Sequence, residues 1–148
     1  INKNSSIIIL GYGGAAQAIY YSFIVKGYKN INIFNRTKKL IETKGGQAFT
    51  QKYQDCDRYF KNCNLIINTT PLNPLSKNQC NMVNKKTIIS DIVYRPQNTI
   101  FLNNFHKNNK IYGISMLINQ AIHCFEYWFG FRPKVYTALK NNLFDIIK

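Results

Sequence analysis

Acidic residues are scarce in this sequence. Six Asp and Glu residues stand against 20 Lys and Arg residues, which gives a formal net charge of +14 at pH 7. A basic surface is the usual electrostatic signature of nucleic-acid binding. The basic residues are scattered along the chain, however, and no module typical of nucleic-acid recognition accompanies them. We therefore expect no nucleic-acid partner and interpret the charge as a solvated surface that also attracts a polyanionic ligand.

Long apolar runs and paired cysteines are also missing. No run approaches the ~20 apolar residues that a membrane span requires, and the N-terminus has no secretory signal pattern. The four cysteines form no C-x-x-C pair, and their spacing with His106 and His123 is not that of a zinc site. We expect a globular, cytoplasmic protein with no disulfide, no metal and no membrane contact. Because the first residue is Ile rather than Met, we also expect a piece of a longer protein.

The 148 residues are enough for one domain with a proper core. Residues 1–6 are polar and predict a linker tail, followed by a single domain over residues 7–148. Short apolar runs alternate with amphipathic stretches. The runs predict strands at 7–10, 31–34, 65–68, 87–93 and 111–112, with a brief one at 48–49, and helices at 14–26, 38–44, 99–108, 116–129 and 133–147. This alternation predicts an α/β fold: a Rossmann-like, doubly wound parallel sheet with C-terminal helices.

A glycine-rich segment, Gly11-Tyr-Gly-Gly-Ala-Ala16, directly follows the first predicted strand. A strand, a glycine turn and a helix start can cradle a pyrophosphate, because the first N–H groups of the helix point at the phosphates and glycine lets the backbone approach closely. The pattern alone is weak, since a tight turn that binds nothing also needs small residues. The helix and second strand that follow supply the context that the fingerprint requires.

The second predicted strand ends in Asn35-Arg36-Thr37, about twenty residues after the glycine segment. An acid at this strand end would bind the ribose 2′-hydroxyl of NAD. Here Arg36 stands in its place, followed by Lys38 and Lys39. Cations at this position suit the 2′-phosphate of NADP, so the sequence predicts NADP(H) as the cofactor.

Five segments in one order resemble the cofactor-binding half of shikimate dehydrogenase, and the resemblance spans nearly the whole chain. They are the stretches at 11–16, 35–37, 66–71, 91–96 and 113–120, and residues 125–130 fit the family's closing helix. The resemblance implies an NADP-dependent oxidoreductase that reduces 3-dehydroshikimate to shikimate, on the route to chorismate and the aromatic amino acids.

The resemblance also implies roles for individual residues. In the family, Leu40 falls where a further basic residue is common, so Lys38 or Lys39 would replace it. Tyr94 and Gln120 fall at positions that face the substrate, although Gln120 could instead serve only to satisfy a buried polar group. The implied cofactor-binding residues are Gly11, Tyr12, Gly13, Gly14, Ala15, Asn35, Arg36, Thr37, Lys38, Lys39, Thr69, Ile92 and Gly113.

Catalytic residues are not expected in this chain. Reduction of a ketone needs a proton donor beside the carbonyl oxygen, and the family's catalytic Lys and Asp lie in an N-terminal substrate-binding domain. Asp91 ends a predicted strand and is interpreted as structural, and His106 and His123 as surface or packed residues. Two alternatives stay open: a non-catalytic NADP-binding or interaction module, and a related dehydrogenase that acts on quinate or another substrate.

Overall fold

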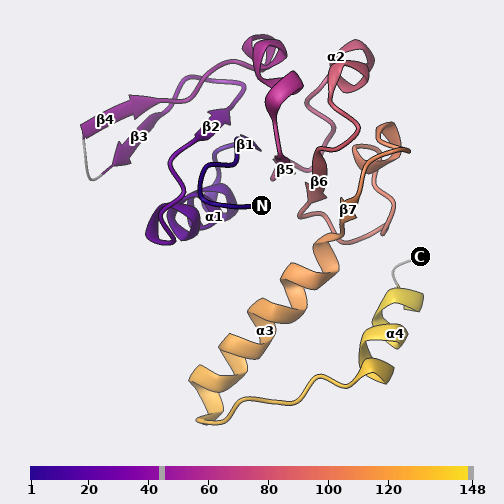
Figure 1. Cartoon of the computed structure of the whole chain (residues 1–148). Helices are drawn as coiled ribbons and strands as arrows, with labels where there is room; N and C mark the ends of the chain where they lie inside the picture. Colours follow the sequence, from indigo (N-terminus) through magenta and orange to yellow (C-terminus); the bar gives the residue numbers. More distant parts are fainter. Residues whose placement is uncertain (44–45, 147–148) are drawn as a thin grey trace.

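A five-stranded parallel sheet organises the chain (Figure 1). The computed structural model describes residues 1–43 and 46–146. The sheet order is β2-β1-β5-β6-β7. The chain starts at β1 and adds β2 on one side of it, then crosses to the other side and adds β5, β6 and β7 in turn. The strands are β1 (Ile7–Leu10), β2 (Ile31–Phe34), β5 (Leu65–Asn68), β6 (Ile88–Asp91) and β7 (Lys110–Ile111). This order confirms the predicted doubly wound α/β class.

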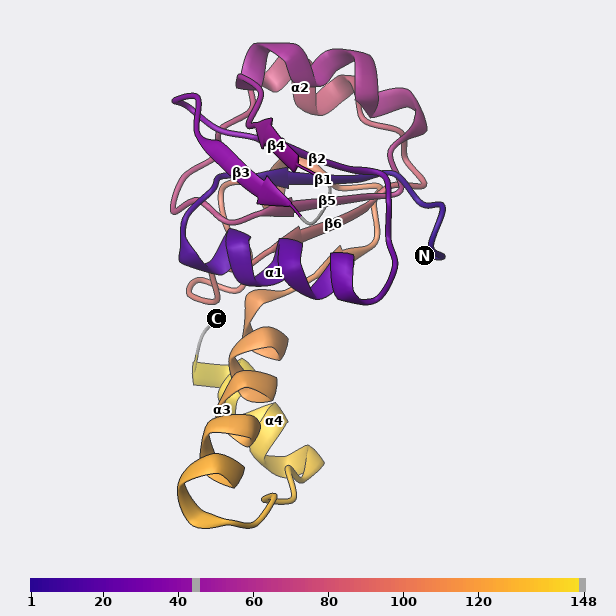
Figure 2. The same ribbon diagram turned by 90° about the vertical axis from the view of Figure 1, so that its left-hand side faces the viewer.

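The connections cover both faces of the sheet (Figure 2). Helix α1 (Gly14–Val25) joins β1 to β2 on one face. Helix α2 (Lys77–Met82) and the 3₁₀ helix η1 (Tyr53–Asn62) lie on the other face, and a second 3₁₀ helix, η2 (Leu102–Asn104), packs into the same core.

Strand β1 separates two hydrophobic cores, and all four of its side chains are fully buried. Ile7 and Ile9 pack on the α1 side, whereas Ile8 and Leu10 pack on the side of η1 and α2. Alternate residues of a strand point to opposite faces, so a sheet covered on both sides needs continuous apolar strands. This explains why the apolar runs predicted the strands well.

The predicted helix at 38–44 is wrong. Residues on either side of 44–45, which lie outside the described residues, form an antiparallel hairpin of β3 (Leu40–Thr43) and β4 (Gly46–Phe49). The hydroxyl of Thr50 closes its base, because it accepts from the backbone N–H of Lys39 (2.9 Å) and donates to the carbonyl of Thr37 (3.3 Å). In the sequence, the Gly45-Gly46 pair that follows the predicted helix is equally a hairpin turn signal. The brief strand predicted at 48–49 is confirmed as the end of β4.

The predicted helix at 99–108 is also wrong, since only η2 forms there. Asparagine side chains compete for the backbone groups of this segment, as when Asn104 Nδ2 donates to the carbonyl of Ile100 at 2.8 Å. Helices η1 and α2 were not predicted. The strand predicted at 87–93 ends at Asp91, and the two C-terminal helices are α3 (Gly113–Phe129) and α4 (Thr137–Ile146), with residue 147 outside the described range.

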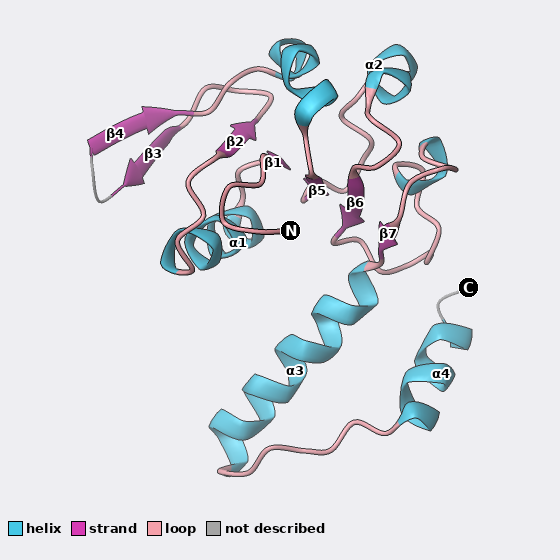
Figure 3. Cartoon of the chain, viewed as in Figure 1, coloured by secondary structure: helices cyan, strands magenta, loops and turns pink. Residues whose placement is uncertain are grey.

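Helices α3 and α4 form an arm that projects from the sheet (Figures 1 and 3). Helix α3 leaves the end of β7, and α4 runs back toward the sheet without reaching it in either view. Large apolar side chains on this arm are exposed: Phe125, Tyr127, Trp128, Phe129, Phe131, Tyr136, Leu139 and Ile146.

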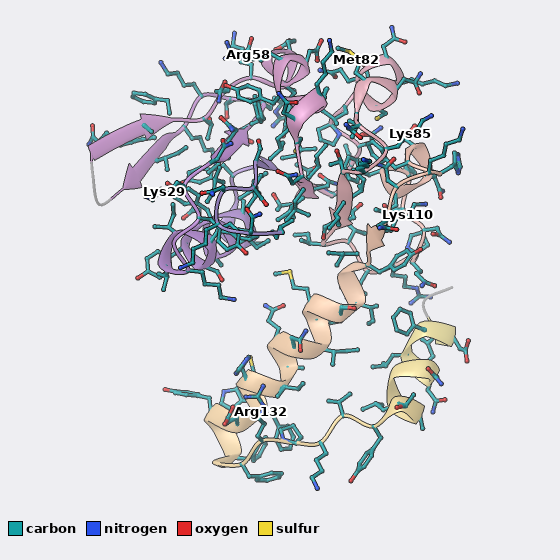
Figure 4. The ribbon with its side chains drawn as sticks, in the orientation of Figure 1. Lys29, Arg58, Met82, Lys85, Lys110 and Arg132 are labelled. Atoms are coloured by element: carbon teal, nitrogen blue, oxygen red, sulfur yellow. The ribbon has the colours of Figure 1, made fainter. Side chains whose placement is uncertain are left out.

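Within the described part of the chain, no helix has the length and apolar character needed to cross a membrane. The basic side chains are spread over the molecule, as the labelled Lys29, Arg58, Lys85, Lys110 and Arg132 show in Figure 4.

Candidate functional site at the carboxyl edge of the sheet

Two adjoining hollows lie along the edge where the parallel strands end. The first, of about 540 Å³, lies between the loops that follow β5 and β6, and we call it the β5–β6 cavity. The second, of about 390 Å³, lies between the loops that follow β2 and β5, and we call it the β2–β5 cavity. Thr70 and Pro71 line both cavities. Open α/β sheets bind ligands at this edge, next to the point where the strand order reverses.

The glycine loop between β1 and α1 closes tightly against the loop that follows β5. Gly11 has φ +101°, and its N–H donates to the carbonyl of Phe34 at 2.7 Å. A Cβ atom at Gly11 would lie 2.5 Å from Thr69 Oγ1, and that hydroxyl donates to the carbonyl of Leu10 at 2.7 Å. Only glycine therefore fits at this position.

Gly13 and Gly14 differ from Gly11, because a Cβ atom at either one would meet nothing within 4 Å. Gly13 is the N-cap of the 12-residue helix α1, and no side chain caps this end. The open N–H groups and the positive end of the helix dipole make the site attractive to an anion. Ala15 lies in the first turn of the helix, and Tyr12 packs against the core on the α1 side.

The β2–β5 cavity is lined by Asn35 and Arg36 from the end of β2. The Nδ2 of Asn35 donates to the carbonyl of Thr37 at 3.0 Å, which shapes the turn that carries Arg36. Lys38 and Lys39 are not among the lining residues, and the ammonium of Lys38 lies 4.3 Å from the ring centroid of Phe49 on β4. Of the three predicted cationic residues, Arg36 lines this cavity, and Lys38 and Lys39 do not.

Tyr53 completes the β2–β5 cavity opposite the proline-rich loop at 71–74, and the sequence analysis missed it. Burial raises the pKa of its phenol, with a further increase from Cys56 and a counteracting decrease from the nearby Arg36 guanidinium. The carbonyl of Tyr53 accepts from Gln79 Nε2 at 3.0 Å, which joins η1 to α2. Tyr53 could not be predicted as a lining residue because η1 itself was not predicted.

The β5–β6 cavity contains three of the predicted residues: Thr69, Ile92 and Tyr94. Gly113 is not among the lining residues but packs against one of them, since a Cβ atom at Gly113 would collide with the backbone carbonyl of Ile92. Gln120 does not line this cavity: it is exposed on α3, seven residues beyond Gly113. Seven residues correspond to about 10 Å along a helix. The substrate role of Gln120 therefore stays a prediction.

Other chemistry-bearing residues lie away from these cavities. His106 and His123 are exposed, and His123 Nδ1 lies 3.7 Å from Glu126 Oε2 on α3. Of the cysteines, Cys56, Cys63 and Cys80 are buried, and burial raises the pKa of each thiol, that of Cys63 to about 12. Cys124 is exposed. No group of three His, Cys, Asp or Glu side chains suited to a metal ion occurs among the residues that the structure describes.

Comparison with known proteins finds sequence similarity to shikimate dehydrogenases over almost the full length of this chain. The shikimate dehydrogenase (NADP(+)) of Bartonella henselae is 35% identical over 152 residues, which cover 92% of this chain and 52% of that protein. The enzyme of the same name from Nitrosopumilus maritimus is 36% identical over 153 residues, covering 95% and 56%. The chain is related to the C-terminal half of shikimate dehydrogenases. It spans about half the length of these curated relatives, and no family model matches it.

Solved structures agree on the fold. A shikimate 5-dehydrogenase from Listeria monocytogenes, in complex with shikimate and NAD, matches with a TM-score of 0.75 at 23% identity, over 95% of this chain and 56% of that chain. A shikimate 5-dehydrogenase from Thermus thermophilus, in complex with NADP(H) and shikimate, matches with a TM-score of 0.74 at 20% identity, over 100% and 57%. Quinate dehydrogenase from Corynebacterium glutamicum, in complex with NAD, has a TM-score of 0.73 at 19% identity, over 95% and 54%.

Proposed function

We propose that this chain is the NADP-binding part of a shikimate dehydrogenase, which reduces 3-dehydroshikimate to shikimate. The observation that carries the proposal is Arg36. It stands just after the end of β2, where an acid would bind NAD, and it lines the β2–β5 cavity, which shares Thr70 and Pro71 with the β5–β6 cavity. The similarity to NADP-dependent shikimate dehydrogenases over more than nine-tenths of the chain supports the same assignment.

The residues at the edge fit each part of an NADP molecule. The open N-terminus of α1 at Gly13 and Gly14 suits a pyrophosphate, because helix N–H groups and the dipole both favour negative charge. The Arg36 guanidinium suits the 2′-phosphate through charge-assisted hydrogen bonds, with Tyr53 as the neighbouring wall. Bound NADPH supplies the hydride. The chain's own residues bind and orient the cofactor, and Ile92 and Gly113 form a close-packed backbone wall near its reacting end.

Among the described residues that line the two cavities, none carries a carboxyl or imidazole group that could donate a proton to the carbonyl oxygen. Asp91 is buried and accepts hydrogen bonds from Thr99, Val93 and Asn68, and the two histidines lie elsewhere. We propose that a substrate-binding domain preceding Ile1 supplies the proton donor, consistent with relatives that are about twice as long. The exposed aromatic arm of α3 and α4 gives that domain a surface to pack against, since such a large apolar patch is unusual on an isolated domain.

The proposal predicts that the chain alone is inactive and that it becomes active when joined to a substrate-binding domain. The chain alone is assayed for shikimate-dependent reduction of NADP⁺, and then again when fused behind the N-terminal half of the Bartonella henselae enzyme. We expect no turnover from the chain alone, because proximity catalysis needs both halves of the site around one substrate, and measurable turnover from the fusion.

Two results would contradict this account of catalysis. Turnover by the chain alone would place the proton donor within it. A folded fusion that binds NADPH but stays inactive with both shikimate and quinate would favour the non-catalytic module, and activity with quinate alone would favour a quinate dehydrogenase.

A further inference from the structure

Two buried polar side chains face each other where β5 and β6 end. Asn68 and Asp91 are each 1% exposed, and they are register partners on neighbouring strands. Asn68 Nδ2 donates to Asp91 Oδ1 at 3.3 Å. Burying polar groups costs free energy unless every one of them is hydrogen-bonded. The buried carboxylate and the buried amide therefore both need several hydrogen-bond partners. These partners lie in the segments that follow β5 and β6.

Asn68 organises the loop that follows β5. Its Oδ1 accepts from the backbone N–H of Thr70 (3.1 Å) and from the Thr70 hydroxyl (2.8 Å). Its Nδ2 donates to the carbonyls of Thr70 (3.2 Å) and Leu72 (3.1 Å). One amide thus holds residues 69–72 in a compact turn, and this turn is the wall shared by the two cavities.

Asp91 organises the loop that follows β6. Its Oδ1 accepts from the backbone N–H of Val93 at 3.1 Å, and its Oδ2 accepts from the hydroxyl of Thr99 at 2.6 Å. Thr99 Oγ1 in turn accepts from the N–H of Leu102 at 3.1 Å. Burial raises the pKa of the Asp91 carboxyl, while the hydrogen bonds from Thr99, Val93 and Asn68 lower it. On the opposite side of the same loop, Gly113 lies against the carbonyls of residues 92 and 93.

The backbone N–H of Ile92 donates to the carbonyl of Asn68 at 3.0 Å, and the hydrogen bond from Asn68 Nδ2 to Asp91 Oδ1 joins the same two loops through their side chains. We propose that Asp91 is a positioning residue: through Asn68 it sets the separation of the 69–72 turn and the 92–95 loop, the two walls of the β5–β6 cavity. The ligand of that cavity rests on the proposed function, in which the reacting end of NADPH binds there. Asp91 does not touch the ligand in this account, and it acts on the far wall only through Asn68.

Amide hydrogen exchange tests the coupling without any ligand. The amide of Thr70 is bonded to Asn68 and not to Asp91. Asp91→Ala should lower its protection by about tenfold or more, as for a lost buried hydrogen bond. Asp91→Asn should largely preserve it, because an acceptor oxygen can stay beside Asn68 and Val93.

Thr87→Val is the matched control. Thr87 is a buried polar residue just before β6, at the opposite edge of the sheet, and its hydroxyl donates to the carbonyl of Cys63 at 2.7 Å. If the Thr70 amide is equally protected from exchange in Asp91→Ala and in Thr87→Val, the proposal is overturned. If Asp91→Ala does not fold, Asp91→Ser replaces it, because the shorter hydroxyl cannot reach Asn68 Nδ2, and the same comparison decides.

Ligand binding supplies the second readout. Adenosine 2′,5′-bisphosphate carries only the end that Arg36 would bind, whereas NADPH also fills the β5–β6 cavity. Asp91→Ala should weaken NADPH binding about fivefold or more and leave the fragment within about twofold, because only one cavity changes shape. Asp91→Asn should restore most of the NADPH affinity. Equal losses for both ligands would mean a general structural defect and would overturn the positioning role. If the unmutated chain binds neither ligand, the proposed function fails and the exchange measurement still decides the role of Asp91.

Discussion

Gly14 and Gly113 occupy the same position in different helices, the first residue of α1 and of α3. Their surroundings are opposite. A Cβ atom at Gly14 meets nothing within 4 Å, whereas one at Gly113 collides with the Ile92 carbonyl. Gly14 leaves open space where a ligand could bind, whereas Gly113 allows two backbone segments to come into contact.

We predict opposite effects for alanine at these two positions. Gly113→Ala should lower the free energy of unfolding by roughly 1–3 kcal/mol, because the backbone of residues 92 and 93 must shift to admit a methyl group. Gly14→Ala should leave stability unchanged or raise it by up to ~1 kcal/mol, since alanine favours the helix. Urea unfolding of the two variants measures both values. A Gly113→Ala variant as stable as Gly14→Ala would mean that the contact with Ile92 is not close.

Single residues also mark the limit of the sequence analysis. Gly11, Arg36, Thr69, Ile92 and Tyr94 were predicted and lie at the carboxyl edge, because motif and strand end occur together in the sequence. Tyr53 could not be predicted, because it reaches the edge through η1, whose 3₁₀ geometry leaves no clear period in the sequence.

At the scale of elements, long-range contacts decided where local patterns failed. The segment at 40–49 contains both helix-forming and β-branched residues, and the closing contact is supplied by Thr50, which lies beyond it. Strands β1 and β5 were predictable because β1 is apolar throughout and β5 is apolar in its first three residues, as burial on both faces requires. The arm of α3 and α4 was predicted as helices, but nothing in the periodicity indicated that it would leave the sheet.

The arm carries the sole tryptophan of the chain, which reports on its surroundings. Trp128 is 70% exposed and Tyr127 is 87% exposed. We predict red-shifted emission from Trp128 in this chain, with ready quenching by acrylamide. In the fusion with the upstream domain of a relative, the emission should shift to the blue and the quenching should fall, because packing removes the indole from water. Unchanged emission in an active fusion would show that the upstream domain does not cover the arm.

For the whole molecule, the net charge of +14 complicates any test of cofactor binding. A basic surface attracts every dinucleotide through long-range electrostatics, and this attraction is screened by salt. A preference for NADPH over NADH does not arise from this general attraction, because it depends on a cation placed beside the 2′-phosphate group. Among the described residues that line the β2–β5 cavity, Arg36 is the cation at that place.

The central claim is tested most directly by titrating this chain with NADPH and with NADH at physiological salt. Arg36→Ala is measured alongside Arg58→Ala, which removes the same charge from an exposed arginine on η1 that bonds Gln51 instead. We predict tighter binding of NADPH by the unmutated chain. Arg36→Ala should reduce that preference about tenfold or more, since a hydrogen bond to a charged group contributes roughly 1.5–3 kcal/mol, and Arg58→Ala should keep it within about twofold. Equal affinity for NADPH and NADH in the unmutated chain, or equal effects of the two substitutions, would contradict the account.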